Sequence, residues 1–228
     1  MARDTGGGGI LTTRVKVCCI ASVEEARMAI DAGASALGLV SEMPSGPGVI
    51  PEDRIAEIAA LAPPGVATFL LTCRTNPAEI VAQRARTGVG VLQLCDEPAP
   101  GARVAVRQAL PGVKIVQVIH VQGAESLEAA RGAAPEVDAL LLDSGRPDLA
   151  VKELGGTGRV HDWETSRAIR EAVEVPVYLA GGLHPGNVAR AIEVVRPFGV
   201  DLCSGIRVDG RLDKGLLRDF MREVSNAS

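Results

Sequence analysis

Apolar runs and amphipathic stretches alternate along almost the whole chain. The apolar runs are short, rich in β-branched residues and uninterrupted, which predicts parallel strands buried on both faces. The predicted strands cover residues 15–20, 36–40, 65–71, 90–94, 113–120, 137–142, 175–180 and 199–202. Each run is followed by a stretch with helical spacing, and the predicted helices cover residues 22–32, 52–61, 76–86, 101–110, 124–131, 163–173, 185–195 and 214–224.

Two helix starts carry strong local signals. Ser22-Val-Glu-Glu25 is a capping box, in which the hydroxyl and the carboxylate each accept a backbone N–H. Asn76-Pro-Ala-Glu79 has a capping residue, proline in the first turn and an acid near the helix N-terminus. These signals support the alternation of strands and helices.

Eight strand–helix units in about 210 residues predict the α/β class and a single (β/α)8 TIM barrel. The alternative is an open doubly wound sheet, which would have fewer strands and a glycine fingerprint after the first one. Cys18 and Cys19 stand where those glycines would begin. We therefore expect a barrel domain over residues 14–228 and a flexible, glycine-rich tail over residues 1–13.

Composition narrows the class of protein. Of the 228 residues, 46% are hydrophobic and only 2% aromatic, so Ala, Val, Leu and Ile must build the core. The net charge of −4 is mixed along the chain, which argues against a nucleic-acid partner. Five cysteines without a CxxC pair argue against a zinc site or a disulfide framework. With no run of about 20 apolar residues and no signal-peptide core, we expect a cytoplasmic protein without a membrane partner.

Candidate chemistry lies where strands end, because the carboxyl ends of barrel strands meet at one face. Cys18 lies near the carboxyl end of the first predicted strand and Asp143 directly follows the sixth, three steps away around a ring of eight. Facing each other, they would make a base and an acid. Alternatively, Cys18 is a small buried hydrophobe and Asp143 a helix cap or loop anchor. In an extended segment Cys19 would point away from Cys18.

Small residues at the last two strands predict a phosphate site. Gly181 and Gly182 follow strand 175–180, and Ser204 and Gly205 follow strand 199–202, so their backbone N–H groups can form a cradle. The alternative is a tight turn that simply needs glycine.

Further pocket candidates are Lys16, on the same strand face as Cys18, and Gln93, near the end of strand 90–94. The long loop after Asp143 contains Gly155, Gly156, Thr157 and Gly158, which either close over a substrate or form a plain flexible loop.

Four segments together resemble the phosphoribosylanthranilate isomerase family. They are Lys16-Val-Cys-Cys-Ile20, Leu142-Asp143 with Gly155-Gly-Thr-Gly-Arg-Val-His-Asp-Trp163, Leu179-Ala-Gly-Gly-Leu-His-Pro-Gly-Asn-Val188, and Gly199-Val-Asp-Leu-Cys-Ser-Gly205 followed by Gly210 and Lys214. The resemblance implies a (β/α)8 barrel without metal or cofactor. Its small-molecule partner would be the phosphosugar N-(5′-phosphoribosyl)anthranilate, rearranged to a 1-deoxyribulose in tryptophan biosynthesis.

The same resemblance implies roles for individual residues. Cys18 would be the general base and Asp143 the general acid, with the phosphate on the backbone of Gly182, Ser204 and Gly205. A thiol on the first strand favours this family over the related histidine-pathway isomerases, which use two aspartates. The resemblance leaves the choice between a monomer and a homodimer open.

Some positions depart from the family pattern. Cys19 replaces a glycine, Pro47 an arginine that holds the anthranilate carboxylate, Cys95 a histidine, and Leu71-Thr72 a segment with an asparagine. Three of these changes fall on the side expected to bind the aromatic half of the substrate. The alternatives are therefore a phosphosugar isomerase or epimerase with another aglycone, or a non-catalytic barrel that binds a phosphate ligand.

Overall fold

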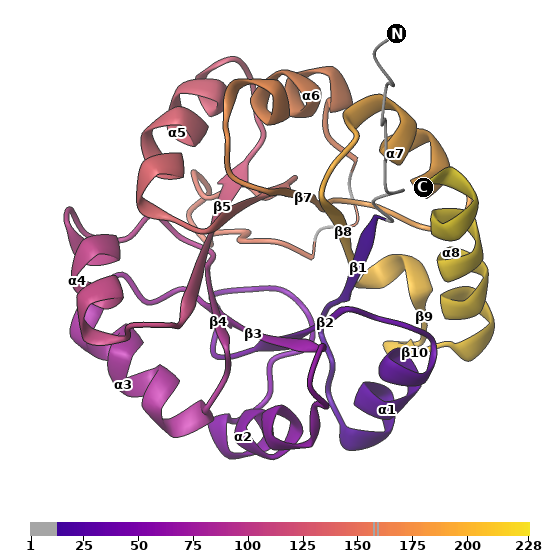
Figure 1. Ribbon diagram of the computed structural model, residues 1–228, viewed down its shortest axis with the longest axis horizontal. Helices are drawn as coiled ribbons and strands as arrows, with labels where there is room; N and C mark the ends of the chain where they lie inside the picture. Colours follow the sequence, from indigo (N-terminus) through magenta and orange to yellow (C-terminus); the bar gives the residue numbers. More distant parts are fainter. Residues whose placement is uncertain (1–12, 157, 159) are drawn as a thin grey trace, which may run out of the picture.

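The strands close into a barrel with helices on the outside, as the alternation of apolar and amphipathic stretches predicts (Figure 1). The computed structural model describes residues 13–156, 158 and 160–228. All of the predicted tail except Thr13 lies outside them. The barrel strands are β1 (Arg14–Val17), β2 (Ala36–Val40), β3 (Ala67–Thr72), β4 (Val91–Leu94), β5 (Lys114–His120), β6 (Ala139–Asp143), β7 (Val177–Leu179) and β8 (Gly199–Leu202).

The helices lie in a ring around the strands (Figure 1). They are α1 (Val23–Asp31), α2 (Glu52–Leu61), α3 (Pro77–Thr87), α4 (Ala102–Ala109), α5 (Glu125–Ala133), α6 (Trp163–Ala172), α7 (Val188–Val195) and α8 (Lys214–Ala227), with short 3-10 turns at Ala134–Glu136 and Ser204–Ile206. The capping predictions are confirmed. Ser22 Oγ accepts from Glu25 N at 3.2 Å, and Asn76 Oδ1 accepts from Ala78 N at 2.9 Å.

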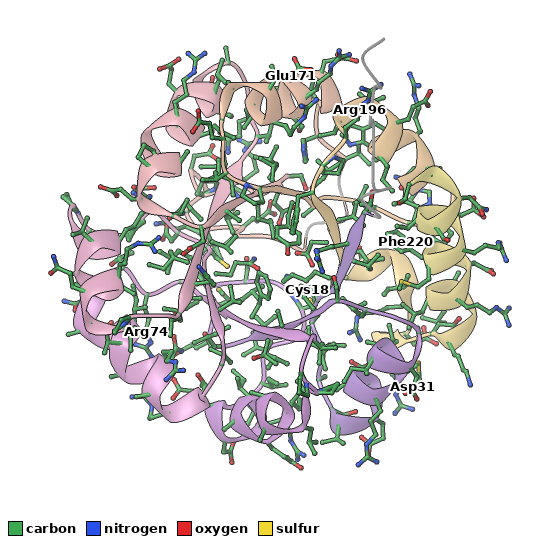
Figure 2. All side chains as sticks on the ribbon, viewed as in Figure 1. Cys18, Asp31, Arg74, Glu171, Arg196 and Phe220 are labelled. Carbon is green, nitrogen blue, oxygen red and sulfur yellow. The ribbon has the colours of Figure 1, made fainter. Side chains whose placement is uncertain are left out.

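Each of the eight barrel strands pairs in parallel with the next, and β1 pairs with β8 to close the ring. This closure rules out the open doubly wound sheet. One apolar layer fills the space between strands and helices, and a smaller one fills the barrel interior. The interior layer is built mostly of Val, Leu, Ala and Cys, and it contains two aromatic side chains, Phe69 and Tyr178, which meet edge to face at 5.9 Å between ring centroids. Figure 2 shows the side chains filling the ring of strands.

Helix α7 begins at Val188, three residues later than predicted. Residues 184–187 form a turn instead, because the Asn187 side chain accepts from His184 N at 2.8 Å and donates to Gly182 O at 3.0 Å. The amide thereby competes with helical hydrogen bonding.

A hairpin between β8 and α8 was not predicted. It consists of β9 (Arg207–Val208) and β10 (Arg211–Leu212). Asp209 and Gly210 join the two strands at φ values of +49° and +77°. Asp-Gly is a strong hairpin signal, because a two-residue turn of this type needs positive φ at both positions. The signal was therefore present in the sequence.

No helix in the described part of the chain is both long and apolar enough to span a bilayer.

Candidate active site

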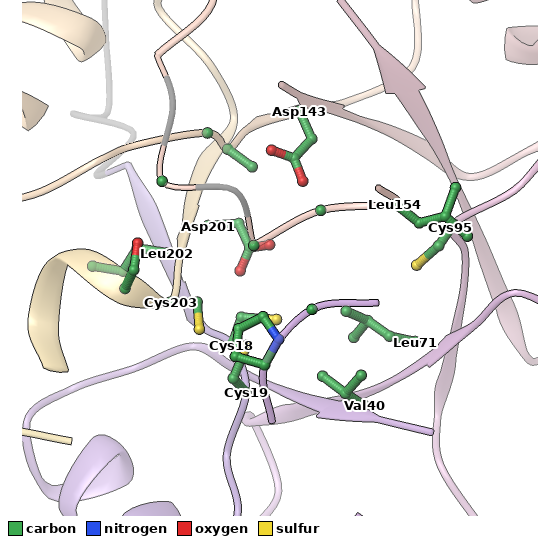
Figure 3. Close-up of a pocket in the computed structure, with 18 of the residues that line it drawn as sticks. Cys18, Cys19, Val40, Leu71, Cys95, Asp143, Leu154, Asp201, Leu202 and Cys203 are labelled. Atoms are coloured by element: carbon green, nitrogen blue, oxygen red, sulfur yellow. The ribbon is translucent and has the colours of Figure 1, made fainter. Parts of the chain in front are cut away.

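A cavity opens at the carboxyl ends of the strands, where the sequence predicts the site (Figure 3). Its walls include the ends of β1, β6 and β8, which carry Cys18, Asp143 and Asp201. The other predicted site residues that line it are Gln93, Gly155, Gly156, Gly158, Gly181, Gly182 and Ser204. Thr157 lies outside the described residues. Lys16 and Gly205 lie just behind the wall rather than in it.

The Cys18 thiol is held against the neighbouring strand β2. Cys18 is only 6% exposed, and its backbone N–H donates to Leu202 O at 2.8 Å, which extends the β1–β8 pairing. A Cβ added to Gly38 would come within 2.7 Å of Cys18 Sγ and 3.0 Å of Lys16 Nζ. The missing side chain at Gly38 therefore creates the space in which the thiol and the ammonium group lie.

A buried ion pair lies beneath the thiol. Lys16 and Asp201 are opposite each other in the β1–β8 register, and Nζ lies 2.9 Å from Oδ1. Burial alone would lower the pKa of Lys16, but the charge of Asp201 and its hydrogen bond with Lys16, together with the nearby Cys18, outweigh burial and the pKa is raised. Lys16 therefore keeps its positive charge next to Cys18. The acid inside the apolar strand β8 was a sequence signal for this partner.

Asp143 projects into the cavity from β6, across from the cysteines (Figure 3). Its Oδ1 accepts from Ser144 N at 2.7 Å, and a Cβ on Gly155 would lie 2.7 Å from its Oδ2. Burial raises the pKa of Asp143, although the Ser144 N–H and the nearby His120 oppose the shift. The proton is thus held more firmly than by an ordinary carboxyl group, which suits a general acid.

The two glycine-rich turns lie against each other at the mouth. Gly181 and Gly182 have φ values of +84° and +63°, a conformation that turns the chain sharply out of β7. A Cβ on Gly205 would overlap the carbonyl oxygen of Leu183, so the turn after β8 can pack closely on the turn after β7. Asn187 fixes the first turn through Gly182 O, a role that sequence reasoning missed.

The loop after β6 covers part of the cavity. Ser45 Oγ donates to Lys152 O at 2.7 Å, which joins this loop to the one after β2. Lys152 Nζ also pairs with Asp96 at 2.5 Å, which ties the loop to the end of β4. A Cβ on Gly156 would lie 2.7 Å from Pro47, so these loops are in direct contact.

The remaining wall is apolar. Pro47, Leu71 and Cys95, which depart from the family pattern, all line it, together with Val40, Met43 and Leu154. Burial raises the pKa of the Cys95 thiol, so this side chain is uncharged. Among the described residues that line the cavity there is no lysine or arginine. Among the described residues there is also no group of three or more His, Cys, Asp or Glu side chains that could hold a metal ion.

The expectation that Cys19 points away from Cys18, so that only one of them faces the pocket, is wrong. Cys19 lines the cavity beside Cys18, because its φ of +60° breaks the extended conformation. Its side chain occupies space left by Gly48, where a Cβ would lie 2.5 Å from Cys19 Cβ. Arg207 supports this bend by donating to the carbonyl oxygens of Cys18 at 3.3 Å and Cys19 at 2.6 Å.

Comparison with known proteins bears on the family and the fold of this chain. The family model described as "PRAI: N-(5'phosphoribosyl)anthranilate (PRA) isomerase" matches residues 15–223. The chain belongs to this family. It is 36% identical to the N-(5′-phosphoribosyl)anthranilate isomerase of Methanocella arvoryzae over 93% of this chain and 98% of that one. For the enzyme of Haloferax volcanii the identity is 37%, over 94% of each chain.

Solved structures of the family have the same fold. The phosphoribosyl anthranilate isomerase of Thermotoga maritima superposes with a TM-score of 0.81 at 26% identity, over 94% of this chain and 99% of that one. The Thermus thermophilus structure gives a TM-score of 0.80 at 27% identity, over 95% and 100%. The family resemblance and the (β/α)8 barrel predicted from the sequence are thus both confirmed.

Proposed function

We propose that the chain is a phosphoribosylanthranilate isomerase of tryptophan biosynthesis. It would convert N-(5′-phosphoribosyl)anthranilate to the 1-deoxyribulose 5-phosphate product, an aldose–ketose isomerisation of the Amadori type. The observation that carries the proposal is that Cys18 and Asp143, from opposite sides of the barrel, line the same cavity as the glycine-rich turns after β7 and β8. Family membership over almost the whole chain supports it independently.

In this proposal the reaction needs two proton transfers, at the two ring atoms that flank C1′. Asp143 donates its proton to the furanose ring oxygen, so the ring opens and a Schiff base forms at C1′. Cys18 as thiolate then removes the proton from C2′, and the resulting enolamine tautomerises to the ketone. The raised pKa of Asp143 supports the acid role, because a carboxyl group must be protonated to donate.

The phosphate would fix the sugar between these two groups. Backbone N–H groups of Gly182, Ser204 and Gly205 are the proposed donors, with Gly181 allowing the turn that presents them. The loop through Gly155, Gly156 and Gly158 would exclude water, since it already contacts both the Asp143 carboxylate and the loop after β2. Lys16 and Gln93 would supply polar groups at the bottom of the cavity.

A second candidate rests on the apolar wall. Without a cation among its described lining residues, the wall around Pro47, Leu71 and Cys95 would also suit a phosphosugar whose aglycone lacks a carboxylate. Such an enzyme would perform the same two proton transfers on a different amine substituent. The proton chemistry is common to both candidates, and only the aglycone separates them.

Complementation separates the two candidates. We expect a tryptophan auxotroph that lacks this isomerase to grow when it carries the wild-type chain, and not with Cys18→Ala or Asp143→Asn. Failure of a folded, well-expressed wild-type chain to rescue growth would favour the other aglycone. Rescue by both variants would overturn the roles given to Cys18 and Asp143.

The compartment and the oligomeric state of the enzyme are part of the proposal. All five cysteines are free, and we place the enzyme in the reducing cytoplasm. Its site is complete within one chain, which is compatible with a monomer or a homodimer. The Thermotoga maritima relative is described as dimeric, with monomeric forms generated from it.

A further inference from the structure

Two thiols that the isomerisation does not use meet at the rim of the cavity. Cys19 follows β1 and Cys203 follows β8, and both line the cavity next to Cys18 (Figure 3). The Cys19 thiol lies within hydrogen-bonding reach of both Cys18 and Cys203. Cys19 and Cys203 are thus close together, although 184 positions separate them in the sequence.

Barrel closure explains why they meet. β1 and β8 are neighbouring parallel strands, with Val17 opposite Leu202 in the register. Continued by one residue, this register places Cys18 opposite Cys203 and Cys19 one step further along. With about 4.8 Å between adjacent strands and about 3.3 Å per residue along a strand, the diagonal Cα separation of Cys19 and Cys203 is roughly 5.8 Å, inside the roughly 4.4–6.8 Å range of disulfides. The positive φ of Cys19 folds the chain back here, so that its thiol stays at the rim.

Cys18 is less well placed than Cys19 to form a disulfide with Cys203. Its Sγ lies against Gly38 on β2, the strand on the other side of β1 from β8. A disulfide between Cys18 and Cys203 would have to pull this sulfur out of the space that Gly38 leaves. A disulfide between the adjacent residues Cys18 and Cys19 would have to distort the short backbone link between them. Cys19 is therefore the better placed partner of Cys203.

The surroundings of Cys203 favour its reaction with an oxidant. Cys203 is partly exposed at the cavity, while Cys19 is buried at 5% exposure. The hydrogen bond from Cys19 lowers the pKa of Cys203, and the nearby Arg207 guanidinium adds to the shift, against the effect of burial. Arg207 is held there by Glu25, whose Oε1 lies 2.9 Å from its Nη1. Hydrogen bonding with the Cys18 thiol, then with Cys203, and burial all raise the pKa of Cys19, which therefore keeps its proton.

We propose that Cys19 and Cys203 form a dithiol that a hydroperoxide oxidises to a disulfide across the β1–β8 rim of the cavity. The Cys203 thiolate attacks the peroxide oxygen, the O–O bond breaks, and Cys203 becomes a sulfenic acid as hydroxide or alkoxide leaves. The Cys19 sulfur then attacks the sulfenic sulfur. The hydroxyl group of the sulfenic acid leaves and combines with the Cys19 proton to form water, while a bond forms between the two sulfur atoms.

Closure of this bond would act directly on the site. Cys19 follows Cys18, and Cys203 precedes Ser204, so the disulfide would constrain the backbone at the base and at the phosphate turn together. A displacement of about 1 Å at a reacting group can lower the rate by roughly 100-fold. We therefore expect the turnover rate of the disulfide form to be at least about tenfold lower than that of the reduced enzyme, and reduction should restore it.

The test uses the full-length protein treated with hydrogen peroxide and then with an alkylating agent. We expect two of the five thiols to be lost, the intact mass to fall by two hydrogen atoms, and peptide mapping to link residues 17–27 to residues 191–207. Dithiothreitol should reverse all three changes. A protein that keeps five alkylatable thiols, or that forms only overoxidised Cys203, would overturn the proposal.

Variants identify the partner of Cys203. Cys19→Gly suits the positive φ at this position and should abolish the link, leaving Cys203 as the sulfenic acid that a dimedone probe detects. If the link persists in Cys19→Gly, then Cys18 is the partner and the proposal is wrong. Cys203→Ser should also abolish the link, as a second variant in case the first one folds poorly. Cys73→Ser is the matched control outside the cavity and should oxidise like the wild type.

Discussion

Loss of the carboxylate beneath the active site should destabilise the whole barrel. Lys16 is fully buried and Asp201 nearly so, and their charged atoms lie 2.9 Å apart. In Asp201→Asn the side chain keeps its shape, but the Lys16 ammonium group loses its counter-charge in a site that water does not reach. Removal of one partner of a buried pair costs about 3–5 kcal/mol of folding free energy.

An upper limit comes from the lysine itself. An unpaired Lys16 can release its proton, and for an ordinary pKa of about 10.4 the neutral form costs about 4.6 kcal/mol at pH 7. This limits the penalty of the unpaired charge itself to roughly 5 kcal/mol, and that penalty should shrink as the pH rises towards the ordinary pKa of lysine. In a chain of this length, a loss of 3–5 kcal/mol lowers the melting temperature by roughly 6–20 °C.

Urea denaturation followed by circular dichroism measures the effect, provided that refolding reproduces the unfolding curve. The double variant Lys16→Met/Asp201→Leu replaces both charges with apolar groups and should recover most of the stability, because neither charge is left unpaired. Glu193→Gln breaks an exposed pair with Arg190 and should change the stability by less than about 0.5 kcal/mol. A loss below about 1 kcal/mol for Asp201→Asn would refute the reasoning.

Three other substitutions have defined outcomes. Because burial raises the folded-state pKa of Asp143, the stability linked to its bound proton is present below the ordinary carboxyl pKa and lost as the pH rises through the folded-state value. Asp143→Asn should therefore lose activity yet unfold at a higher urea concentration than the wild type at pH 7. The difference between their urea midpoints should be smaller at pH 4, and an equal difference at the two pH values would contradict this reasoning. Cys19→Gly should be about 1 kcal/mol more stable than Cys19→Ala, because φ is +60° at this position and glycine adopts that conformation without strain. Elsewhere alanine is usually the more stable of the two, and melting curves of the two variants test the prediction. Gly205→Ala should raise KM for the phosphosugar at least about tenfold, because its methyl group collides with Leu183 O; steady-state kinetics with an unchanged KM would argue against a phosphate site at this turn.

Most of the fold follows from local patterns in the sequence. The bounds of α2 (Glu52–Leu61) and β8 (Gly199–Leu202) coincide with the prediction, because uninterrupted apolar runs and helical spacing mark them clearly. The start of α7 was misplaced because the Asn187 side chain bonds to backbone groups of the preceding turn. Pro185 alone gives no sign of that competition.

The site was predictable as a set of strand ends but not in its details. The positions of Cys18 and Asp143 follow from barrel topology alone, since every strand ends at the same face. The inward turn of Cys19 depends on the space beside Gly48, a residue about thirty positions away in the sequence. The partner of Lys16 depends on the β1–β8 register, which no local pattern fixes.

The contact between Cys19 and Gly48 also limits how this sequence can change. Because a Cβ at position 48 would lie 2.5 Å from Cys19 Cβ, the two positions cannot both carry ordinary side chains without a shift of the backbone. A chain with glycine at both positions can accept a cysteine at position 19 in one step. Once it has done so, position 48 must remain glycine, and the order of substitutions along any mutational path between relatives is constrained accordingly.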